Sequence, residues 1–210
     1  MNIHNLVLGE FETNSYVLTA DDSSTDCVII DAGLNAGELV DYITQQNLNP
    51  VAVILTHGHA DHIVGLRQLR RSFPKIEVVI SQADSTMLTD SVGNLSSMLG
   101  RPFTTDPAQV IIRQEQKLSY AGIDFDVIFT PGHTPGGMSL HCQKDGVVFV
   151  GDTLFAGSVG RTDFPGGDAA QLIKSIKEKL LCLDGTTRAY PGHGLMTTIS
   201  LEKNSNPFLR

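Results

Sequence analysis

Short runs of apolar residues, separated by polar turns, form the opening of the chain. Residues 3–8, 15–19 and 27–30 are rich in aliphatic and β-branched side chains, and turn-forming residues such as glycine and aspartate lie between them. Apolar runs bounded by turn residues are typical of β-strands. We therefore expect three short strands here, joined as an antiparallel meander.

Apolar residues at helical spacing appear in three later segments. Residues 38–46 place Leu39 and Ile43 on one face, and residues 61–72 and 169–181 show the same kind of pattern. Apolar positions three and four residues apart lie on one side of a helix. The spacing predicts three amphipathic helices, and a further short helix is expected at the C-terminus.

The remaining apolar runs predict strands. They cover residues 51–55, 76–80, 111–112, 117–120, 125–129, 138–141, 147–150 and 188–190. Residues 81–99 predict one or two short helices, and the segment 100–109, with Pro102 and Pro107, favours a connection between two halves. Strands followed by helices occur twice. We therefore expect an α/β architecture of two similar halves, packed sheet against sheet with helices outside.

Composition and charge disfavour several classes of protein. The 210 residues carry 15 Lys and Arg against 23 Asp and Glu, a formal net charge of −8, which disfavours a protein that binds nucleic acid through phosphate contacts. The N-terminus lacks the basic residues and apolar run of a signal peptide, and no run is long enough to cross a bilayer. Three widely spaced cysteines are typical of reduced thiols. We expect one domain over residues 1–210 in the cytoplasm, without a nucleic-acid or membrane partner.

Histidine and aspartate residues directly follow four of the predicted strands. In chain order they are His57, His59, Asp61, His62, His133, Asp152 and His193. In α/β sheets, ligands bind beyond the strand ends, where loops project polar groups from a rigid base. Five of the seven histidines lie in these turns. The sequence therefore predicts that these side chains converge on one site.

Imidazoles and carboxylates in this pattern indicate a catalytic metal centre. These ligand types suit zinc, iron or manganese. The spacing predicts two adjacent ligand sets, the first with His57 and His59 and the second with Asp61 and His62. Structural zinc sites are closed and usually rich in cysteine, whereas this set has no cysteine and too many ligands for one closed ion. An enzyme is therefore favoured over a metal-stabilised binding module.

The motif HxHxDH at residues 57–62, followed by His133, Asp152 and His193, resembles the metallo-β-lactamase superfamily. The resemblance covers essentially the whole chain and implies an αββα sandwich with the site at one edge of its two sheets. It implies two divalent metal ions, with zinc favoured and iron or manganese as alternatives. The implied ligands are His57, His59 and His133 for the first ion and Asp61, His62 and His193 for the second, with Asp152 bridging.

Three further stretches are similar to glyoxalase II and its short bacterial relatives. They are Gly-Asp-Thr-Leu-Phe at 151–155, Gly-Arg-Thr-Asp-Phe at 160–164 and Tyr-Pro-Gly-His-Gly at 190–194. This similarity implies a hydroxyacylglutathione hydrolase-like enzyme, in which a metal-bridging hydroxide attacks an S-acylglutathione such as S-lactoylglutathione. Asp61 and Asp152 would then be catalytic and Arg161 would bind the substrate. Asp163 stands where that family has a tyrosine, and no C-terminal glutathione-binding helical domain is expected.

Other reactions of the same fold stay open. A persulfide dioxygenase of this superfamily shares the Gly-Arg-Thr-Asp-Phe stretch, and it would hold a single Fe(II) with His57, His133 and Asp152. A lactonase or β-lactamase-type hydrolase would use the same attacking hydroxide, while the net charge of −8 disfavours an RNA-cutting phosphodiesterase. The acyl group, the thiol carrier and the oligomeric state are open as well.

Overall fold

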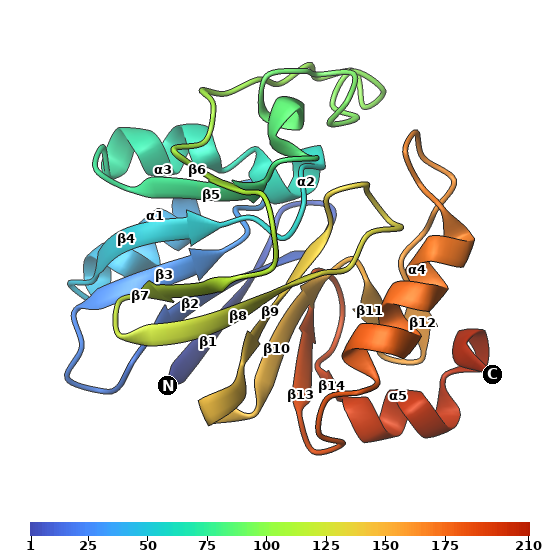
Figure 1. The fold of residues 1–210 in the computed structure, drawn as a ribbon. Coiled ribbons are helices and arrows are strands. Elements are labelled where there is room, and N and C mark those ends of the chain that lie inside the picture. The colour runs from blue at the N-terminus through green and yellow to red at the C-terminus, as the bar shows by residue number, and fades with distance from the viewer.

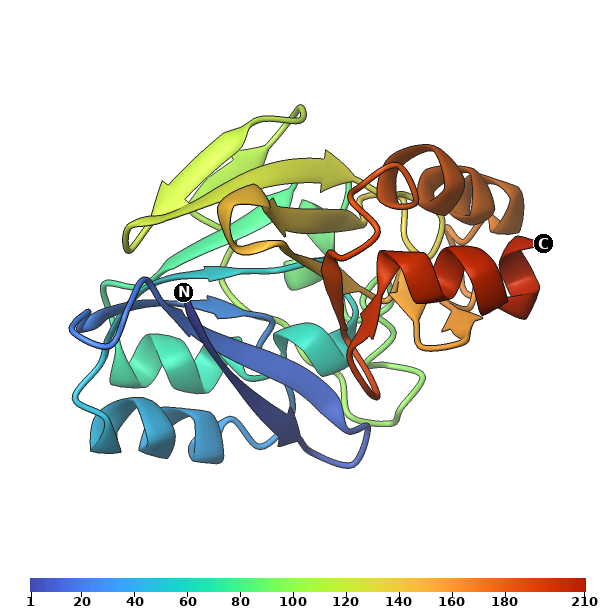
Figure 2. The ribbon, with the colours of Figure 1, turned by 90° about the horizontal axis from the view of Figure 1, so that it is seen from below.

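Two six-stranded β-sheets face each other in the computed structural model, which describes residues 1–210 (Figure 1). Helices cover the outer face of each sheet, which produces a four-layer arrangement (Figure 2). An apolar core lies between the two sheets and contains residues of both. The predicted α/β fold, an αββα sandwich with helices outside, is confirmed.

The first sheet contains the strands of the N-terminal half. In spatial order they are β1 (Asn2–Leu8), β2 (Thr13–Thr19), β3 (Asp26–Ile30), β4 (Asn49–Ile54), β5 (Glu77–Ser81) and β6 (Val110–Ile112). The first three strands pair antiparallel, which confirms the predicted meander, and β3 to β6 run parallel. The loop after β4 therefore leaves the sheet at the edge where the other parallel strands also end.

The second sheet contains the strands of the C-terminal half. In spatial order they are β14 (Thr197–Thr198), β13 (Arg188–Pro191), β10 (Val147–Gly151), β9 (Met138–Cys142), β8 (Ile123–Phe129) and β7 (Lys117–Tyr120). β10 and β13 are parallel and the other neighbours are antiparallel. A small separate hairpin, β11 (Leu154–Phe155) and β12 (Ser158–Val159), follows β10 and was not predicted.

The helices pack on the outer faces of the sheets. They are α1 (Gly37–Gln45), α2 (Ala60–Ile63), α3 (Leu66–Ser72), α4 (Ala169–Ser175) and α5 (Ile199–Ser205), with a π-helical extension of α4 (Ile176–Leu180) and 3₁₀ turns at Ser85–Leu88, Gln143–Asp145 and Pro207–Leu209. α1 and α3 bury Leu39 and Leu69 against the first sheet, while α4 and α5 bury Leu172 and Ile199 against the second. None of these helices has the length and apolar character needed to span a membrane.

The inner strands of the first sheet, β2 to β5, bury both of their faces. In β3, Val28 and Ile30 belong to the core between the sheets, whereas Cys27 and Ile29 pack with the outer helices. This alternation follows from the two-residue repeat of a strand. The second sheet contributes large side chains such as Phe125, which is completely buried in the same inner core. Packing between the sheets therefore holds the strand ends of both halves in fixed relative positions.

The single helix predicted for residues 61–72 is interrupted, because α2 ends before Val64 and α3 begins after Gly65. The Gly65 amide donates a hydrogen bond of 2.9 Å to the Ala32 carbonyl. A Cβ at Gly65 would lie 2.7 Å from the Gly33 carbonyl oxygen, so only glycine permits this approach. This close contact with the loop after β3 lies between α2 and α3, so the two segments are separate helices. α2 carries two of the candidate ligands, Asp61 and His62.

The connection between the two halves also differs from the prediction. Residues 100–109 lead back into the first sheet, where Val110 of β6 pairs with Val79 of β5. The connection is instead the short segment 113–116 before β7. Residues 81–99 contain one 3₁₀ turn and otherwise consist of bends and turns. The three-residue β6 is apolar like the strands that follow it, so nothing local indicates which sheet it joins.

Truncation of Phe125 tests the inner core. We expect Phe125→Ala to lower the free energy of unfolding of the metal-free protein by about 3–5 kcal/mol, because it leaves a cavity between the sheets. Phe208→Ala, at a side chain that is 56% exposed, serves as the control and is expected to cost less than about 1 kcal/mol. Urea denaturation followed by circular dichroism measures both, and equal losses would contradict the assignment of Phe125 to the core.

Candidate metal centre

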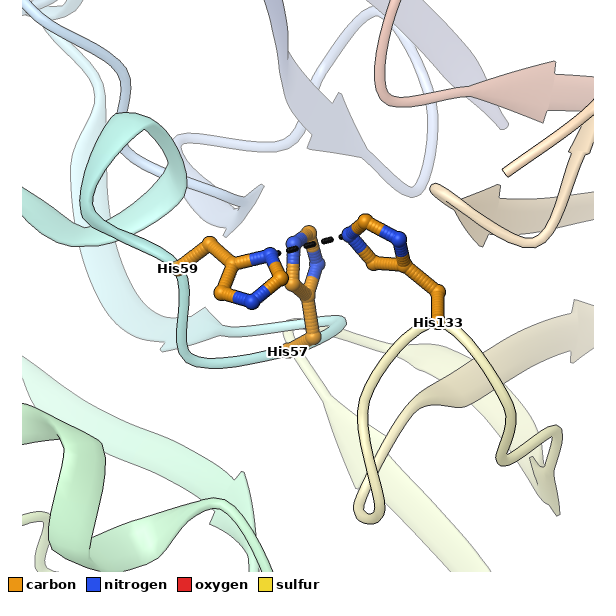
Figure 3. Close-up of side chains that lie close together, drawn as sticks. All are labelled: His57, His59 and His133. Carbon is orange, nitrogen blue, oxygen red and sulfur yellow. Dashed lines mark hydrogen bonds between the residues drawn. The ribbon is translucent and has the colours of Figure 1, made fainter. Parts of the chain in front are cut away.

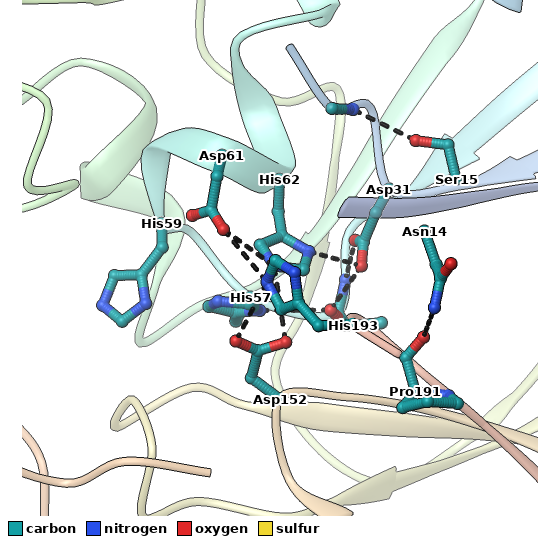
Figure 4. A network of polar contacts seen from close by, with 12 residues as sticks. Asn14, Ser15, Asp31, His57, His59, Asp61, His62, Asp152, Pro191 and His193 are labelled. Atoms are coloured by element: carbon teal, nitrogen blue, oxygen red, sulfur yellow. Dashed lines mark hydrogen bonds and ion pairs between the residues drawn. The ribbon is translucent and has the colours of Figure 1, made fainter. Parts of the chain in front are cut away.

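Four loops meet beyond the carboxyl ends of β4, β8, β10 and β13. β4 leads to His57, His59, Asp61 and His62, β8 to His133, β10 to Asp152 and β13 to His193. The structure brings all seven side chains together at one edge of the two sheets (Figures 3 and 4). Residues that are far apart in the sequence therefore form one cluster, as the strand-end pattern predicts.

His57, His59 and His133 form the first group (Figure 3). Their candidate ligand atoms all lie within 4.8 Å of one another, and His59 Nδ1 is 2.9 Å from His133 Nε2. The three residues are only 2–5% exposed. Two imidazole nitrogens at this distance need either a proton or a cation between them, because two lone pairs repel. The group thus has the geometry of a three-histidine metal site.

Asp61, His62 and His193 form the second group, beside the first. Asp61 Oδ2 lies 3.2 Å from His193 Nε2 and 3.5 Å from His62 Nε2. The two imidazole Nε2 atoms are themselves 3.3 Å apart. Figure 4 shows these three side chains directed toward a common point. A carboxylate with two imidazoles suits zinc, iron or manganese.

Asp152 lies between the two groups. Its Oδ1 is 3.4 Å from His62 Nε2, and its Oδ2 is 3.6 Å from His133 Nε2 and 3.5 Å from His193 Nε2. One carboxylate thus approaches imidazoles of both groups. Figure 4 shows Asp152 beside His62 and His193 of the second group. This is the placement expected of a ligand shared between two neighbouring cations.

Buried polar atoms without partners support a cation in this cluster. His57 Nε2 and Asp152 Oδ1 are buried and make no hydrogen bond. Leaving such an atom unpaired costs about 1–3 kcal/mol each. Coordination by a divalent ion satisfies an imidazole lone pair and a carboxylate oxygen at once. The residues present therefore fit the divalent metals that the pattern predicts.

The protonation preferences of His57, His59 and Asp152 agree with ligand roles. Burial, together with the adjacent His62, holds the pKa of His57 well below its ordinary value, and burial with His133 lowers the pKa of His59 to about 3. Both rings are therefore neutral at pH 7, the form that binds metals. Burial opposes ionisation of Asp152, but His62 and His193 lower the pKa of its carboxyl well below the ordinary value. His57 and His59 thus present neutral rings near the Asp152 carboxylate. Burial opposes protonation of His62 and His193, but the neighbouring Asp61 and Asp152 raise the pKa of both rings above the ordinary value.

Asp31, which the sequence analysis did not single out, orients His62. Asp31 Oδ2 accepts a hydrogen bond of 2.9 Å from His62 Nδ1, so the Nε2 lone pair of His62 is directed toward Asp61 and Asp152. The carboxylate is itself held by the Thr56 amide and hydroxyl, each at 2.8 Å. Such outer partners fix the tautomer of a metal-binding histidine. Asp31 follows the apolar strand β3, so the strand-end pattern could have identified it.

Asp84 links the two loops that carry the first group. Its buried carboxylate accepts hydrogen bonds from the Gly58 amide at 3.2 Å, the Thr134 hydroxyl at 2.7 Å and the Gly136 amide at 2.7 Å. Gly58 lies between His57 and His59, and Thr134 follows His133. Asp84 therefore fixes the relative positions of the two loops that carry the three histidines, although it bonds to none of the imidazoles. No local sequence signal identifies it.

The loop that carries His193 is held by β2. The Asn14 side-chain amide donates to the carbonyls of Pro191 and Gly194 at 3.0 and 2.9 Å, and the Tyr16 hydroxyl donates to Pro191 at 2.6 Å. A Cβ at Gly192 would lie 2.2 Å from Asp152 Oδ1, so this position requires glycine. The N-terminal meander thus positions a C-terminal ligand.

An open cleft of about 460 Å³ lies over the centre. Apolar side chains form much of its wall, namely Phe11, Leu95, Leu99, Phe155, Val159 and Phe164. Arg161, predicted to bind the substrate, also lines the cleft. Its guanidinium makes two hydrogen bonds of 2.7 Å to Asp163 and lies 3.9 Å from the centre of the Phe164 ring. The position of Arg161 suits substrate contact, but it already has an anionic partner.

Comparisons with known proteins cover nearly the whole chain. A family model described as the metallo-beta-lactamase superfamily matches residues 8–193. The probable metallo-hydrolase YqgX of Bacillus subtilis (strain 168) is 37% identical over 210 residues, with 100% of this chain and 98% of the relative covered. The hydroxyacylglutathione hydrolase GloC of Haemophilus influenzae is 36% identical over 211 residues, with 100% and 98% covered.

Solved structures show the same similarity. The crystal structure of BLEG-1 B3 metallo-beta-lactamase has a TM-score of 0.95 and 41% identity, with 99% of each chain covered. TTHA1623 in a di-iron-bound form has a TM-score of 0.85 and 33% identity, with 98% of this chain and 100% of that chain covered. ETHE1 from Myxococcus xanthus has a TM-score of 0.79 and 29% identity, with 99% and 84% covered.

The contacts of Asp84 predict a loss of metal affinity when its carboxylate is replaced. In Asp84→Asn, an NH₂ group takes the place of one acceptor oxygen, so one loop of the first group loses its anchor. We expect the affinity for one of two Zn²⁺ ions to fall about 10–100-fold. Calorimetric titration of the metal-free protein measures this. Asp90→Asn, an exposed position on the same segment, is the matched control, and equal affinities in both variants would contradict the role of Asp84.

Proposed function

Because this chain belongs to the metallo-beta-lactamase superfamily, we propose that it hydrolyses thioesters at a two-metal centre, with S-acylglutathiones such as S-lactoylglutathione as substrates. Superfamily membership and the similarity to metallo-hydrolases support a metal-dependent hydrolase. The observation that carries the two-metal proposal is Asp152, whose single carboxylate approaches histidines of both groups of ligands. The similarity to the hydroxyacylglutathione hydrolase GloC supports the substrate class.

Each group of side chains would hold one ion. His57, His59 and His133 would bind the first, Asp61, His62 and His193 the second, and Asp152 would bind both. Two divalent ions held in this way lower the pKa of a shared water and polarise the substrate carbonyl. Zinc is our first choice, and the di-iron form of TTHA1623 supports iron as the alternative.

The chain's own residues supply orientation and access. Asp61 is partly exposed to the cleft, so its carboxylate can accept a hydrogen bond from a water that approaches the centre. Arg161, at the cleft wall, would pair with a carboxylate of the thiol carrier, in competition with Asp163. A thiol with a pKa near 8.5 leaves as the thiolate without a strong general acid. Outside the candidate metal ligands, no carboxylic acid or histidine lines the cleft, which is consistent with thioester cleavage.

β-Lactam hydrolysis is the second candidate. The similarity to BLEG-1, described as a B3 metallo-beta-lactamase, favours this activity. The two reactions require the same attack on an acyl carbon, so the centre itself does not distinguish them. The leaving groups differ, because an amide nitrogen needs a proton and a thiolate does not.

A persulfide dioxygenase with one Fe(II) would use only part of the cluster. His57, His133 and Asp152 would bind that ion. Asp61 and His193 would then have no ligand role, although Asp61 lies 3.2 Å from His193 in a complete second group. This second group favours the hydrolase over the dioxygenase.

Thiol release tests the proposed reaction. We expect zinc-loaded protein to release glutathione from S-lactoylglutathione, and Asp152→Ala to lower kcat/KM at least about 100-fold, because both metal groups lose a shared ligand. Asp124→Ala, an exposed aspartate on β8, is the matched control and should leave turnover unchanged. The metal content of each variant is measured in the same samples.

The same preparations separate the alternatives. Hydrolysis of nitrocefin without thiol release would favour the β-lactamase candidate. Oxygen consumption with glutathione persulfide by iron-loaded protein, again without thiol release, would favour the dioxygenase. Either result would overturn the thioester proposal.

A further inference from the structure

The cleft over the metal centre continues into a second compartment. This side compartment has a volume of about 270 Å³ and lies between the β1–β2 turn, α2 and the segment 96–103. Its apolar lining consists mainly of Phe11, Leu34, Val64, Leu99, Pro102 and Phe103. A volume of this size lies just below the usual range for a small-molecule site. It is large enough for one arm of a ligand whose other arm occupies the main cleft.

The side compartment opens at the metal centre. Phe11, Ala60, Asp61 and Leu99 line both the main cleft and the side compartment, and Asp61 is a candidate ligand of the second ion. Arg161 lines the main cleft but not the side compartment. A substrate that reaches from Arg161 across the centre would therefore place its far arm in the side compartment.

The lining of the side compartment offers almost no free polar group. Glu10 and Arg101 pair with each other at 3.5 Å and are largely exposed. The buried Ser96 hydroxyl is already bonded to its own segment, where it accepts from the Phe103 amide at 2.8 Å. Phe11 and Leu99, in contrast, leave 38% and 48% of their surface exposed. An apolar ligand would remove this surface from water, whereas a polar one would gain no partner beyond Asp61.

We propose that the side compartment binds the acyl group of the substrate, and that this group is an apolar chain longer than acetyl or lactoyl. The assignment rests on the proposed thioester hydrolysis and orients the substrate, with the thiol carrier toward Arg161 and the acyl chain toward Phe103. Each methylene group moved from water into an apolar site strengthens binding by up to about fourfold. The compartment is partly open, so the gain per methylene group is smaller than this limit.

A series of glutathione thioesters tests the proposal. With zinc-loaded protein, we expect kcat/KM for S-hexanoylglutathione to exceed the values for S-acetyl- and S-lactoylglutathione at least about tenfold. Val64→Phe fills the side compartment and should reduce the hexanoyl-to-acetyl ratio to about one. Val159→Phe, which narrows only the main cleft, is the matched control and should leave this ratio close to the wild-type value. Leu34→Phe provides a second filling variant if Val64→Phe does not fold.

Binding without turnover supplies an independent measurement. S-hexylglutathione and S-methylglutathione are thioethers that cannot be hydrolysed, and calorimetry of the zinc-loaded protein compares their Kd values. We expect the Kd of S-hexylglutathione to be at least about tenfold lower than that of S-methylglutathione. In Val64→Phe we expect the two Kd values to be about equal.

The outcomes separate this proposal from the proposed function. If kcat/KM for the lactoyl or acetyl thioester equals or exceeds that for the hexanoyl thioester, the side compartment does not bind the acyl group. The proposed thioester hydrolysis would not be affected by this result. A hexanoyl preference that Val64→Phe and Leu34→Phe do not reduce would also overturn the acyl assignment. If no thioester is cleaved, the proposed function fails, and equal Kd values for the two thioethers, or no binding of either, would end the acyl assignment with it.

Discussion

The crowding of ionisable side chains at one buried point is the constraint on which the rest of the structure depends. Five imidazoles and two carboxylates lie in contact distance of one another, and most of them are shielded from water. Such groups would separate or change protonation unless the surrounding chain held them. Asp31 and Asp84, which accept hydrogen bonds, and Asn14, which donates them, provide this support from three different parts of the fold. The two-sheet core therefore serves to fix the loops as well as to bury apolar surface.

Much of the fold and of the candidate centre could be predicted because the relevant signals are local. Each candidate ligand follows an apolar strand within a few residues, and the end of a strand is visible in the sequence. Where strands are parallel or meet across a core, their ends share an edge. His57 and His193 could thus be assigned to one site although they are far apart in the chain. The continuous apolar run at residues 51–55 likewise indicates a strand buried on both faces.

The parts that could not be predicted depend on contacts between distant residues. The helix break at Gly65 follows from the approach of the Ala32–Gly33 backbone, which helical periodicity does not record. Asp84 lies 26 positions from Gly58 and 52 from Gly136, so its role becomes visible only in three dimensions. The sheet that receives β6 is decided by its pairing with β5 and not by its composition. The apolar side compartment is also assembled from separate loops.

Residues from the two ends of the chain meet at the centre, and this determines the order in which the site can form during synthesis. Asn14 bonds to Gly194 across 180 positions, and His193 bonds to Phe11 across 182. On a ribosome-bound chain, the first group must wait at least for residue 161, because His133 Nδ1 is bonded to the Arg161 carbonyl. The second group must wait for His193 after β13. Contacts over such separations form late because closing a long loop is entropically costly. The nascent protein therefore holds an incomplete cluster, and all seven candidate ligands come together only when translation is almost complete.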